Sequence, residues 1–229
     1  MDDDGEMMMA VLKKILNMIH SIIFNFRAFP IEVARKLPIK IAYDTKIDYI
    51  RKGCIQIEGD IHRSMIKIGV TGLEGVTGER KSHIRFGKES TAKVIFKGDA
   101  VIARGALLAA DRGTLIFGKG FSANNNFYVS CNDRIEFGDS VMIGWEVKVR
   151  DSDNHVIIED GKEKKSHAPV RIHERVWIAS YCDILKGAEV GEGSVVAYRA
   201  LVTKAYEQSN CMLAGAPAKV IAEKIDWKM

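Results

Sequence analysis

The sequence predicts an all-β solenoid of short stacked strands preceded by one helix, and three observations support this prediction. β-Branched aliphatic residues recur at every sixth position through the last third of the chain. This spacing breaks once, in a polar stretch that follows Val149. An apolar stretch with helical periodicity, Met7–Phe29, comes first. A period of six fits neither a helix nor an alternating strand, but it fits a repeated strand plus turn.

The composition indicates one globular domain with a substantial core. The chain has 229 residues, of which 47% are hydrophobic and 28% are charged. The net charge of +4 is mild, and the absence of an Arg/Lys block gives no case for a nucleic-acid partner. The four cysteines form no C-x-x-C pair, which argues against a disulfide or zinc framework. We therefore expect reduced cysteines in a cytoplasmic protein.

The N-terminal stretch reads as an amphipathic helix. Polar and charged residues interrupt Met7–Phe29, whereas a bilayer core needs about twenty nearly uncharged residues. The acidic start, Asp2 to Glu6, stands where a signal peptide carries positive charge. One helical face collects the apolar residues Val11, Ile15, Met18, Ile19, Ile22 and Phe26. We expect a helical segment over residues 1–38 whose apolar face packs on its own domain or a partner subunit, with peripheral contact to the inner membrane face as the alternative.

The six-residue repeat is the strongest signal. Every sixth residue is a β-branched aliphatic in the series Ile172, Ile178, Ile184, Val190, Val196 and Val202. The same frame occurs earlier at Phe137, Ile143 and Val149, at Phe96, Ile102 and Leu108, and in isolated copies at Phe86 and Phe117. Three such steps make a triangular coil of about eighteen residues, whose aliphatic side chains stack in parallel ladders. A β-sandwich with chance spacing is the alternative, but it gives strict six-residue registration no role.

From Val176 onward the chain resembles the hexapeptide-repeat acyltransferases. The resemblance rests on Val176–Ser180 (VWIAS), Ile184–Gly187 (ILKG), Val202–Lys204 (VTK) and Gly215–Ile221 (GAPAKVI). It is specific over residues 135–226 and looser over 60–134. Within the family the chain is similar to enzymes that acetylate sugars in surface polysaccharide synthesis.

This resemblance implies a left-handed parallel β-helix, which we expect over residues 39–226 with 227–229 as a C-terminal tail. It also implies a homotrimer with active sites between neighbouring β-helices. The implied reaction moves an acetyl group from acetyl-CoA to a sugar hydroxyl. An N-acetyltransferase acting on an amino sugar and a non-catalytic trimeric scaffold stay open as alternatives.

The break in the repeat marks the candidate catalytic residue. The frame that ends at Val149 predicts an inward aliphatic at position 155, but the chain has His155 there and resumes the repeat only at Ile172. We expect a loop containing 160–165 to leave the solenoid here. Attack of a hydroxyl on a thioester needs a base, and a neutral imidazole suits this task.

The resemblance places the family's catalytic histidine at His155, and a functionless loop histidine is the alternative. A carboxylate can hold the imidazole tautomer, and Asp153 is our first candidate for this role, with Asp151 next. His167, on the same loop, could line the acceptor site, but a solvated loop histidine is the simpler interpretation. His173 follows an inward position, so we expect it to face outward.

Cofactor-contacting positions follow from the resemblance and comprise Ser180, Tyr198, Thr203, Lys204 and Lys219. A groove between coils can hold the pantetheine arm through backbone hydrogen bonds, while lysines meet the phosphates. The alternative for the two lysines is a solvated surface. The chain departs from the family at Tyr198-Arg199, where two small residues are common, and this bulk changes the expected groove.

For the acceptor, the candidates are Asn126, in the run 124–126, and Trp145. Amides can bond sugar hydroxyls and an indole can stack on a sugar ring. The Asn run is equally consistent with a turn or a stacked ladder, and Trp145 with an interface residue. We expect no metal, because the spacing of His155, His167 and His173 does not suggest the converging ligands of a zinc-dependent carbonic anhydrase.

Overall fold

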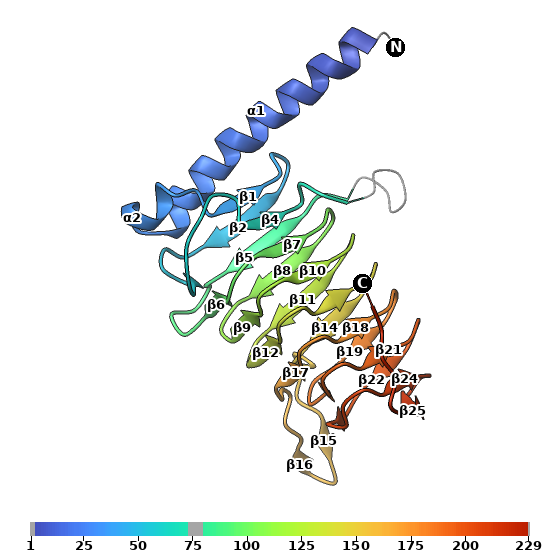
Figure 1. Ribbon diagram of the computed structural model, residues 1–229. Helices are drawn as coiled ribbons and strands as arrows, with labels where there is room; N and C mark the ends of the chain where they lie inside the picture. The colour runs from blue at the N-terminus through green and yellow to red at the C-terminus, as the bar shows by residue number, and fades with distance from the viewer. Residues whose placement is uncertain (1–2, 73–79, 229) are drawn as a thin grey trace.

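A computed structural model describes residues 3–72 and 80–228 of the protein. Within them, the strands form three parallel sheets that wrap around one core as the sides of a triangular prism (Figure 1). The chain visits the sheets in turn, so each strand pairs with the strand three positions later along most of the prism. This is the solenoid that the six-residue repeat predicts.

We call the three sides sheets A, B and C. Sheet A contains β1 (Ile39–Ile41), β4 (Ile66–Ile68), β7 (Ala100–Ile102), β10 (Phe121–Ala123), β13 (Met142–Ile143), β18 (Trp177–Ile178), β21 (Val195–Val196), β24 (Met212–Ala214) and the antiparallel β25 (Lys219–Ala222). Sheet B contains β2 (Lys46–Ile50), β5 (His83–Phe86), β8 (Leu107–Ala110), β11 (Tyr128–Cys131), β14 (Lys148–Arg150), β19 (Asp183–Ile184) and β22 (Leu201–Val202). Sheet C contains β3 (Ile55–Ile57), β6 (Lys93–Phe96), β9 (Thr114–Phe117), β12 (Arg134–Phe137), β17 (Val170–Ile172), β20 (Glu189–Val190) and β23 (Ala205–Tyr206).

The predicted inward residues form the core. All six aliphatics from Ile172 to Val202 are fully buried, as are the earlier copies of the frame. The strand register places Ile172 beside Val190 and Ile184 beside Val202, which is a coil of eighteen residues. The predictions of inward direction and coil length are therefore confirmed, and they rule out the sandwich alternative.

The first half of the prism has wider coils with an aromatic core. Phe96, Phe117 and Phe137 lie at matching positions of sheet C, and their rings stack with centroid distances of 4.9 and 5.6 Å. Phe121 tilts against two of these rings from sheet A. Phenyl rings thus fill the space that Ile and Val fill in the narrower C-terminal coils, because a close-packed core leaves no void at either width.

Helix α1 (Asp3–Ala28) covers the open end of sheet A, and the short α2 (Ile31–Ala34) follows it. Asn25 accepts a hydrogen bond from the backbone N–H of Ile39 (3.1 Å) and donates one to its carbonyl (2.6 Å). Ser21 accepts from the N–H of Ile41 at 3.0 Å. These side chains satisfy backbone groups of β1 that no neighbouring strand meets, so the helix protects an edge strand.

The orientation of α1 corrects one prediction. The apolar face that begins at Val11 does not pack on its own domain, because within this chain it points to solvent. Its packing on a partner subunit stays a prediction. The face that packs on the solenoid carries Ser21, Phe24 and Asn25. By length and composition alone the stretch Met7–Ala28, with mean hydropathy 1.5, could also cross a membrane, which the interrupting charges led us not to expect.

Candidate functional site

Two of the prism's three corners carry the candidate residues. Corner AB is the turn between each sheet A strand and the following sheet B strand, and corner BC is the turn between sheets B and C. At corner AB, stacked turns use residues with left-handed backbone, namely Gly105 (φ +81°), Asn126 (+61°), Glu146 (+55°), Tyr181 (+63°) and Arg199 (+59°). The side chains of successive coils therefore stack along this corner.

Gly144 shows how tightly these coils approach each other. A β-carbon on Gly144 would lie 2.6 Å from the backbone nitrogen of Ser180, one coil later. Glycine permits this approach, and Trp145 follows directly. The N–H of Trp145 then donates to Ser180 Oγ at 3.1 Å, and the N–H of Tyr181 donates to the Trp145 carbonyl at 2.8 Å.

Corner AB brings together five of the nine predicted site residues. Asn126, Trp145, Ser180 and Tyr198 come from consecutive coils along it. Lys219 joins them because β25 folds back along β24, with Lys219 beside Ala214. The predicted acceptor residues and three of the predicted cofactor residues thus share one corner.

Asn126 is more buried than an acceptor contact requires. Its side chain is 6% exposed, and its amide donates to Glu146 Oε1 at 2.6 Å. The left-handed conformation of Asn126 is one that asparagine tolerates, so the turn alternative for the Asn run describes this residue. Arg80 lies 3.4 Å from Glu146 on the same corner. Sequence reasoning singled out neither partner, since no motif contains them.

Tyr181, Tyr198 and Arg199 form an exposed cluster at corner AB. The two tyrosine rings meet edge to face at 5.5 Å, and the Arg199 guanidinium lies 5.7 and 5.3 Å from their centroids. The tyrosines remain 45% and 56% exposed. Aromatic faces beside a guanidinium suit a ligand that combines a planar ring with phosphates. The departure from small residues at Tyr198-Arg199 therefore creates this cluster.

At corner BC the predicted loop leaves the prism after β14 and returns at β17. Its base is closed by hydrogen bonds from Asp153 N–H to the Ser166 carbonyl (2.8 Å) and from Ala168 N–H to the Asp151 carbonyl (3.0 Å). Its outer part is a hairpin of β15 (Ile158–Glu159) and β16 (Lys162–Glu163). Asp160 and Gly161 have φ of +51° and +73°, as a two-residue hairpin turn requires. The interruption predicted from the broken repeat is confirmed.

Asp151 anchors the start of this loop. Its carboxylate is fully buried and accepts hydrogen bonds from the backbone N–H groups of Asn132 (2.8 Å) and Asp133 (2.7 Å) on the preceding coil. Burial raises the pKa of this carboxyl above its usual range, while those hydrogen bonds oppose the rise. Asp151 therefore holds the loop base, and among the described residues no hydrogen bond or ion pair joins it to His155.

Asp153 makes a different contact from the one predicted. Its carboxylate forms an ion pair with the Lys186 ammonium, which also donates to the Lys165 carbonyl at 2.7 Å. Among the described residues, no hydrogen bond or ion pair joins Asp153 to His155. In this chain Asp153 thus ties the loop to the next coil. Lys186 belongs to the ILKG motif, but the motif alone does not show that its side chain reaches Asp153 across the loop.

His155 is exposed on the loop, and no partner for it is found in the part of the chain that the structure describes. Thr203 and Lys204 lie at the same corner, two coils further on, and Lys204 sits 5.3 Å from the Tyr206 ring centroid. The candidate residues therefore divide between two corners that flank sheet B.

The two other histidines in the last third of the chain are His167 and His173. His173 faces outward as predicted, and its Nε2 lies 2.7 Å from Glu189 Oε1 on sheet C. His167 bridges to Ser152 at the loop base and lies 3.4 Å from Ser166 Oγ. Within residues 3–72 and 80–228, no group of three His, Cys, Asp or Glu side chains converges as metal ligands would. The carbonic anhydrase alternative has no ligand set there.

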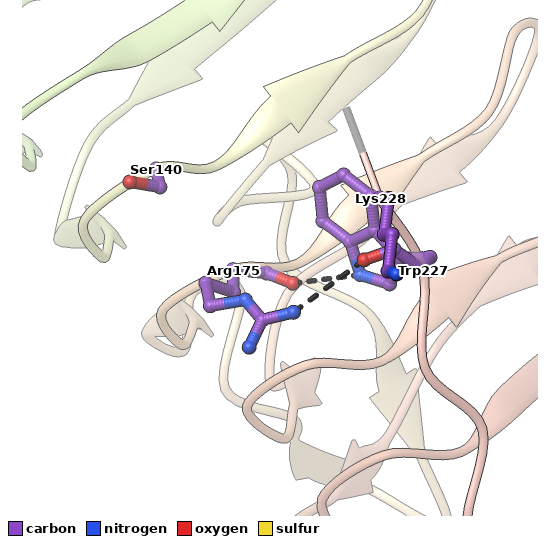
Figure 2. A pocket seen from close by; sticks show the side chains of 4 residues that line it. All are labelled: Ser140, Arg175, Trp227 and Lys228. Atoms are coloured by element: carbon purple, nitrogen blue, oxygen red, sulfur yellow. Dashed lines mark hydrogen bonds between the residues drawn. The ribbon is translucent and has the colours of Figure 1, made fainter.

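A hollow lies at the third corner, away from these residues (Figure 2). It is lined by Ser140, Arg175, Trp227 and Lys228. The Trp227 indole N–H donates to the Arg175 carbonyl at 3.0 Å, and Arg175 pairs with Asp226 at 3.0 Å. These contacts fasten the C-terminal tail to the prism, and the hollow receives no candidate residue.

Comparison with known proteins supports the family resemblance. No family model matches the chain. The polysialic acid O-acetyltransferase of Escherichia coli O1:K1 is 34% identical over 133 residues, covering 57% of this chain and 41% of the relative. The galactoside O-acetyltransferase of Escherichia coli K12 is 32% identical over 107 residues, covering 46% and 52%. The chain thus spans about half the length of these curated relatives.

A solved structure has the same fold. The crystal structure of a polysialic-acid-specific acetyltransferase matches with a TM-score of 0.60 and 24% identity, covering 83% of this chain and 79% of that one. The predicted resemblance to sugar O-acetyltransferases of the hexapeptide-repeat type is confirmed by these matches.

Proposed function

We propose that this protein is an acyltransferase that moves an acetyl group from acetyl-CoA to a hydroxyl group of a sugar, on a left-handed parallel β-helix. The observation that carries the proposal is the break in the solenoid after β14, which lifts His155 out of the coil at the same corner that holds Lys204. The similarity to two sugar O-acetyltransferases supports the same reaction class.

In the proposed reaction, donor and acceptor are bound together and no covalent enzyme intermediate forms. The acceptor oxygen attacks the thioester carbonyl while the His155 imidazole removes the hydroxyl proton. The carbon–sulfur bond then breaks, and the imidazolium returns the proton to the thiolate. An exposed loop gives the imidazole access to both substrates.

The coenzyme is proposed to lie against residues of both corners. At corner AB, Ser180 and the exposed Tyr198 offer a hydroxyl and a ring, and Lys219 offers a charge for a phosphate. At corner BC, Thr203 offers a hydroxyl group and Lys204 offers a charge for a phosphate. The Tyr181–Arg199 contact adds a further stacking surface.

We further propose that the active enzyme is a homotrimer. The nine candidate residues divide between two corners on opposite edges of sheet B, so one chain does not surround a substrate. Threefold packing of triangular prisms would set corner AB of one copy beside corner BC of the next. His155, for which no hydrogen bond or ion pair is found among the described residues, would then face the donor site of a neighbour. Four free, buried cysteines and a coenzyme A donor support a cytoplasmic enzyme.

The proposal is tested by measuring thiol release from acetyl-CoA in the presence of nucleotide sugars and oligosaccharides. Acceptor-dependent release, with an ester found on the product by NMR, is the expected result. An amide product would show that the acceptor is the amino group of an amino sugar and not a hydroxyl group. If no acceptor causes thiol release and the protein does not bind coenzyme A, the trimeric scaffold is the remaining function.

A further inference from the structure

Helix α1 has the reverse of the usual amphipathic arrangement, because its polar residues face the solenoid. Asn17, Ser21 and Asn25 are spaced four apart, so they lie in one row along the helix. They bond to the backbone of β1 and to Tyr43 just beyond it, with 2.7 Å from Tyr43 N–H to Asn17 Oδ1. The polar side chains of this row therefore form their hydrogen bonds within the protein.

The opposite side of α1 is apolar and uncovered. At 100° per residue, the outward side chains span an arc of about 140°. All are exposed by 37% to 68%, and they are Met8, Val11, Leu12, Ile15, Met18, Ile19, Ile22, Ile23 and Phe26. An exposed apolar surface of this size marks a binding site.

Basic residues border this surface beyond the first turns of the helix. Four acidic residues stand at positions 2–6, and from Met7 to Lys52 the chain has nine Lys or Arg and three Asp or Glu. Lys14 and Arg27 border the two edges of the apolar arc on the helical wheel, where long basic side chains can reach lipid phosphates while their stems lie on apolar groups. Two of the three acidic residues already have partners, since Asp44 pairs with Arg104 and Asp48 with Lys46.

The contacts of α1 with the solenoid determine how it could meet a bilayer. Its second half, from Asn17 to Ala28, is held along β1 by the hydrogen bonds above and by the buried Phe24. Only residues 3–16 extend beyond these contacts, a length of about 21 Å at 1.5 Å per residue, against a hydrocarbon core of about 30 Å. The helix therefore cannot span a bilayer while it caps the prism, but it can lie flat (Figure 1).

We propose that α1 docks this protein onto the surface of an anionic lipid bilayer. The apolar arc enters the boundary between headgroups and acyl chains, and Lys14, Arg27 and neighbouring basic residues contact the lipid phosphates. The lipid surface is favoured over a second copy of the chain because basic side chains border both edges of the apolar arc, where they can reach lipid phosphates. This docking is independent of the acetyl-transfer proposal.

The test is flotation of the full-length protein with vesicles of phosphatidylcholine alone or with about one third phosphatidylglycerol. Wild type should float with the anionic vesicles and only weakly with the neutral ones. Ile15→Glu/Ile19→Glu should reduce flotation at least about tenfold, because both substituted side chains lie in the apolar arc. Ile158→Glu, at a still more exposed isoleucine on the distant loop, is the control and should float like wild type.

Three results would overturn the proposal. If wild type fails to float, α1 does not bind a lipid surface. If the double variant then also loses the trimeric state, the apolar arc binds a second copy of the chain. Equal flotation of wild type and the double variant would show that another surface binds. Retention of wild type on vesicles after an alkaline carbonate wash would indicate a spanning helix, since a flat helix should be released. Thermal unfolding of the double variant close to wild type confirms that it folds.

Discussion

Corners AB and BC flank the same sheet but are built in different ways. From β7 onward corner AB is a regular stack, in which each turn has a left-handed residue and the exposed Tyr181, Tyr198 and Arg199 contact one another. Corner BC is interrupted by a loop that carries His155 into solvent. In the proposed function, the regular stack places groups that bind the coenzyme, whereas the break in the repeat places the base that must approach two substrates.

The loop at corner BC is nevertheless tied to the regular part of the prism. Asp151 fixes it to the preceding coil through backbone N–H groups, and Asp153 fixes it to the following coil through Lys186. Position is thus transmitted from the rigid stack to the exposed imidazole by two carboxylates. Substitutions in the regular stack, at the two carboxylates that hold the loop, and at a site away from both corners separate the contributions of the stack and of the carboxylates.

The largest effect is expected for Ile184→Asp, inside the stack. Ile184 is fully buried between Val149 and Val202, so the new carboxylate would lack a partner and cost about 4 kcal/mol of unfolding free energy. Chemical denaturation measures the loss. Lys67→Asp, at an exposed position of β4, introduces the same group outside the core and should stay close to wild type. Equal stability of the two variants would refute the inward register.

Asp151→Ala should have the next largest effect. It removes the acceptor of two partly buried backbone N–H groups, and hydrogen bonds to charged groups contribute about 1.5–3 kcal/mol each. We expect a loss of about 2 kcal/mol, faster hydrogen exchange in the loop, and turnover reduced about tenfold or more because the imidazole is displaced. Asp160→Ala, at the exposed hairpin turn, is the control, and a loss there as large as at Asp151 would contradict the anchoring role.

Asp153→Asn and Lys186→Met should each cost about 1 kcal/mol, because the pair is partly exposed. If the two side chains act only on each other, the double variant should be no worse than either single one. Turnover and stability of the four proteins are compared. Reduced turnover in Asp153→Asn with unchanged turnover in Lys186→Met would show that Asp153 acts on His155 in the assembled enzyme, as the sequence predicted.

The smallest effect is expected away from both corners, at Glu189 on sheet C. The hydrogen bond from His173 is the main cause that lowers the pKa of Glu189, so this carboxylate stabilises the fold above its unfolded pKa of about 4.3 and loses that contribution as pH falls through the lowered value. Glu189→Gln should cost under about 1 kcal/mol at pH 7, with a difference from wild type that shrinks toward acid pH. Unchanged acetyl transfer is expected. A difference that grows in acid would reverse the sign of this linkage.

Sequence periodicity predicted the core because each inward position depends on a local spacing. The ladder from Ile172 to Val202 and the loop before it follow from the six-residue count alone. Contacts across coils were not predictable in this way. Lys186 reaches Asp153 only because the chain returns to the same corner after the loop, and no local pattern encodes that return.

The N-terminal helix shows the same limit. Asn17 and Asn25 read as interruptions of an apolar stretch, but their partners Tyr43 and Ile39 belong to the first strand region. Helical periodicity identified the apolar face correctly, but that face does not pack on its own domain, as one of the predicted arrangements required. Edge strands need partners for their backbone groups, and that demand appears only when the solenoid is built.

The most direct test of the central claim is steady-state kinetics of His155→Ala, with His167→Ala as the matched loop control. We predict that His155→Ala lowers kcat by about 10²–10⁴ and leaves coenzyme A affinity unchanged, since the coenzyme is held elsewhere. The fall of wild-type activity toward acid pH, expected of a base that must be neutral, should vanish in this variant. His167→Ala should behave like wild type. Wild-type turnover in His155→Ala with a verified acceptor would contradict the account.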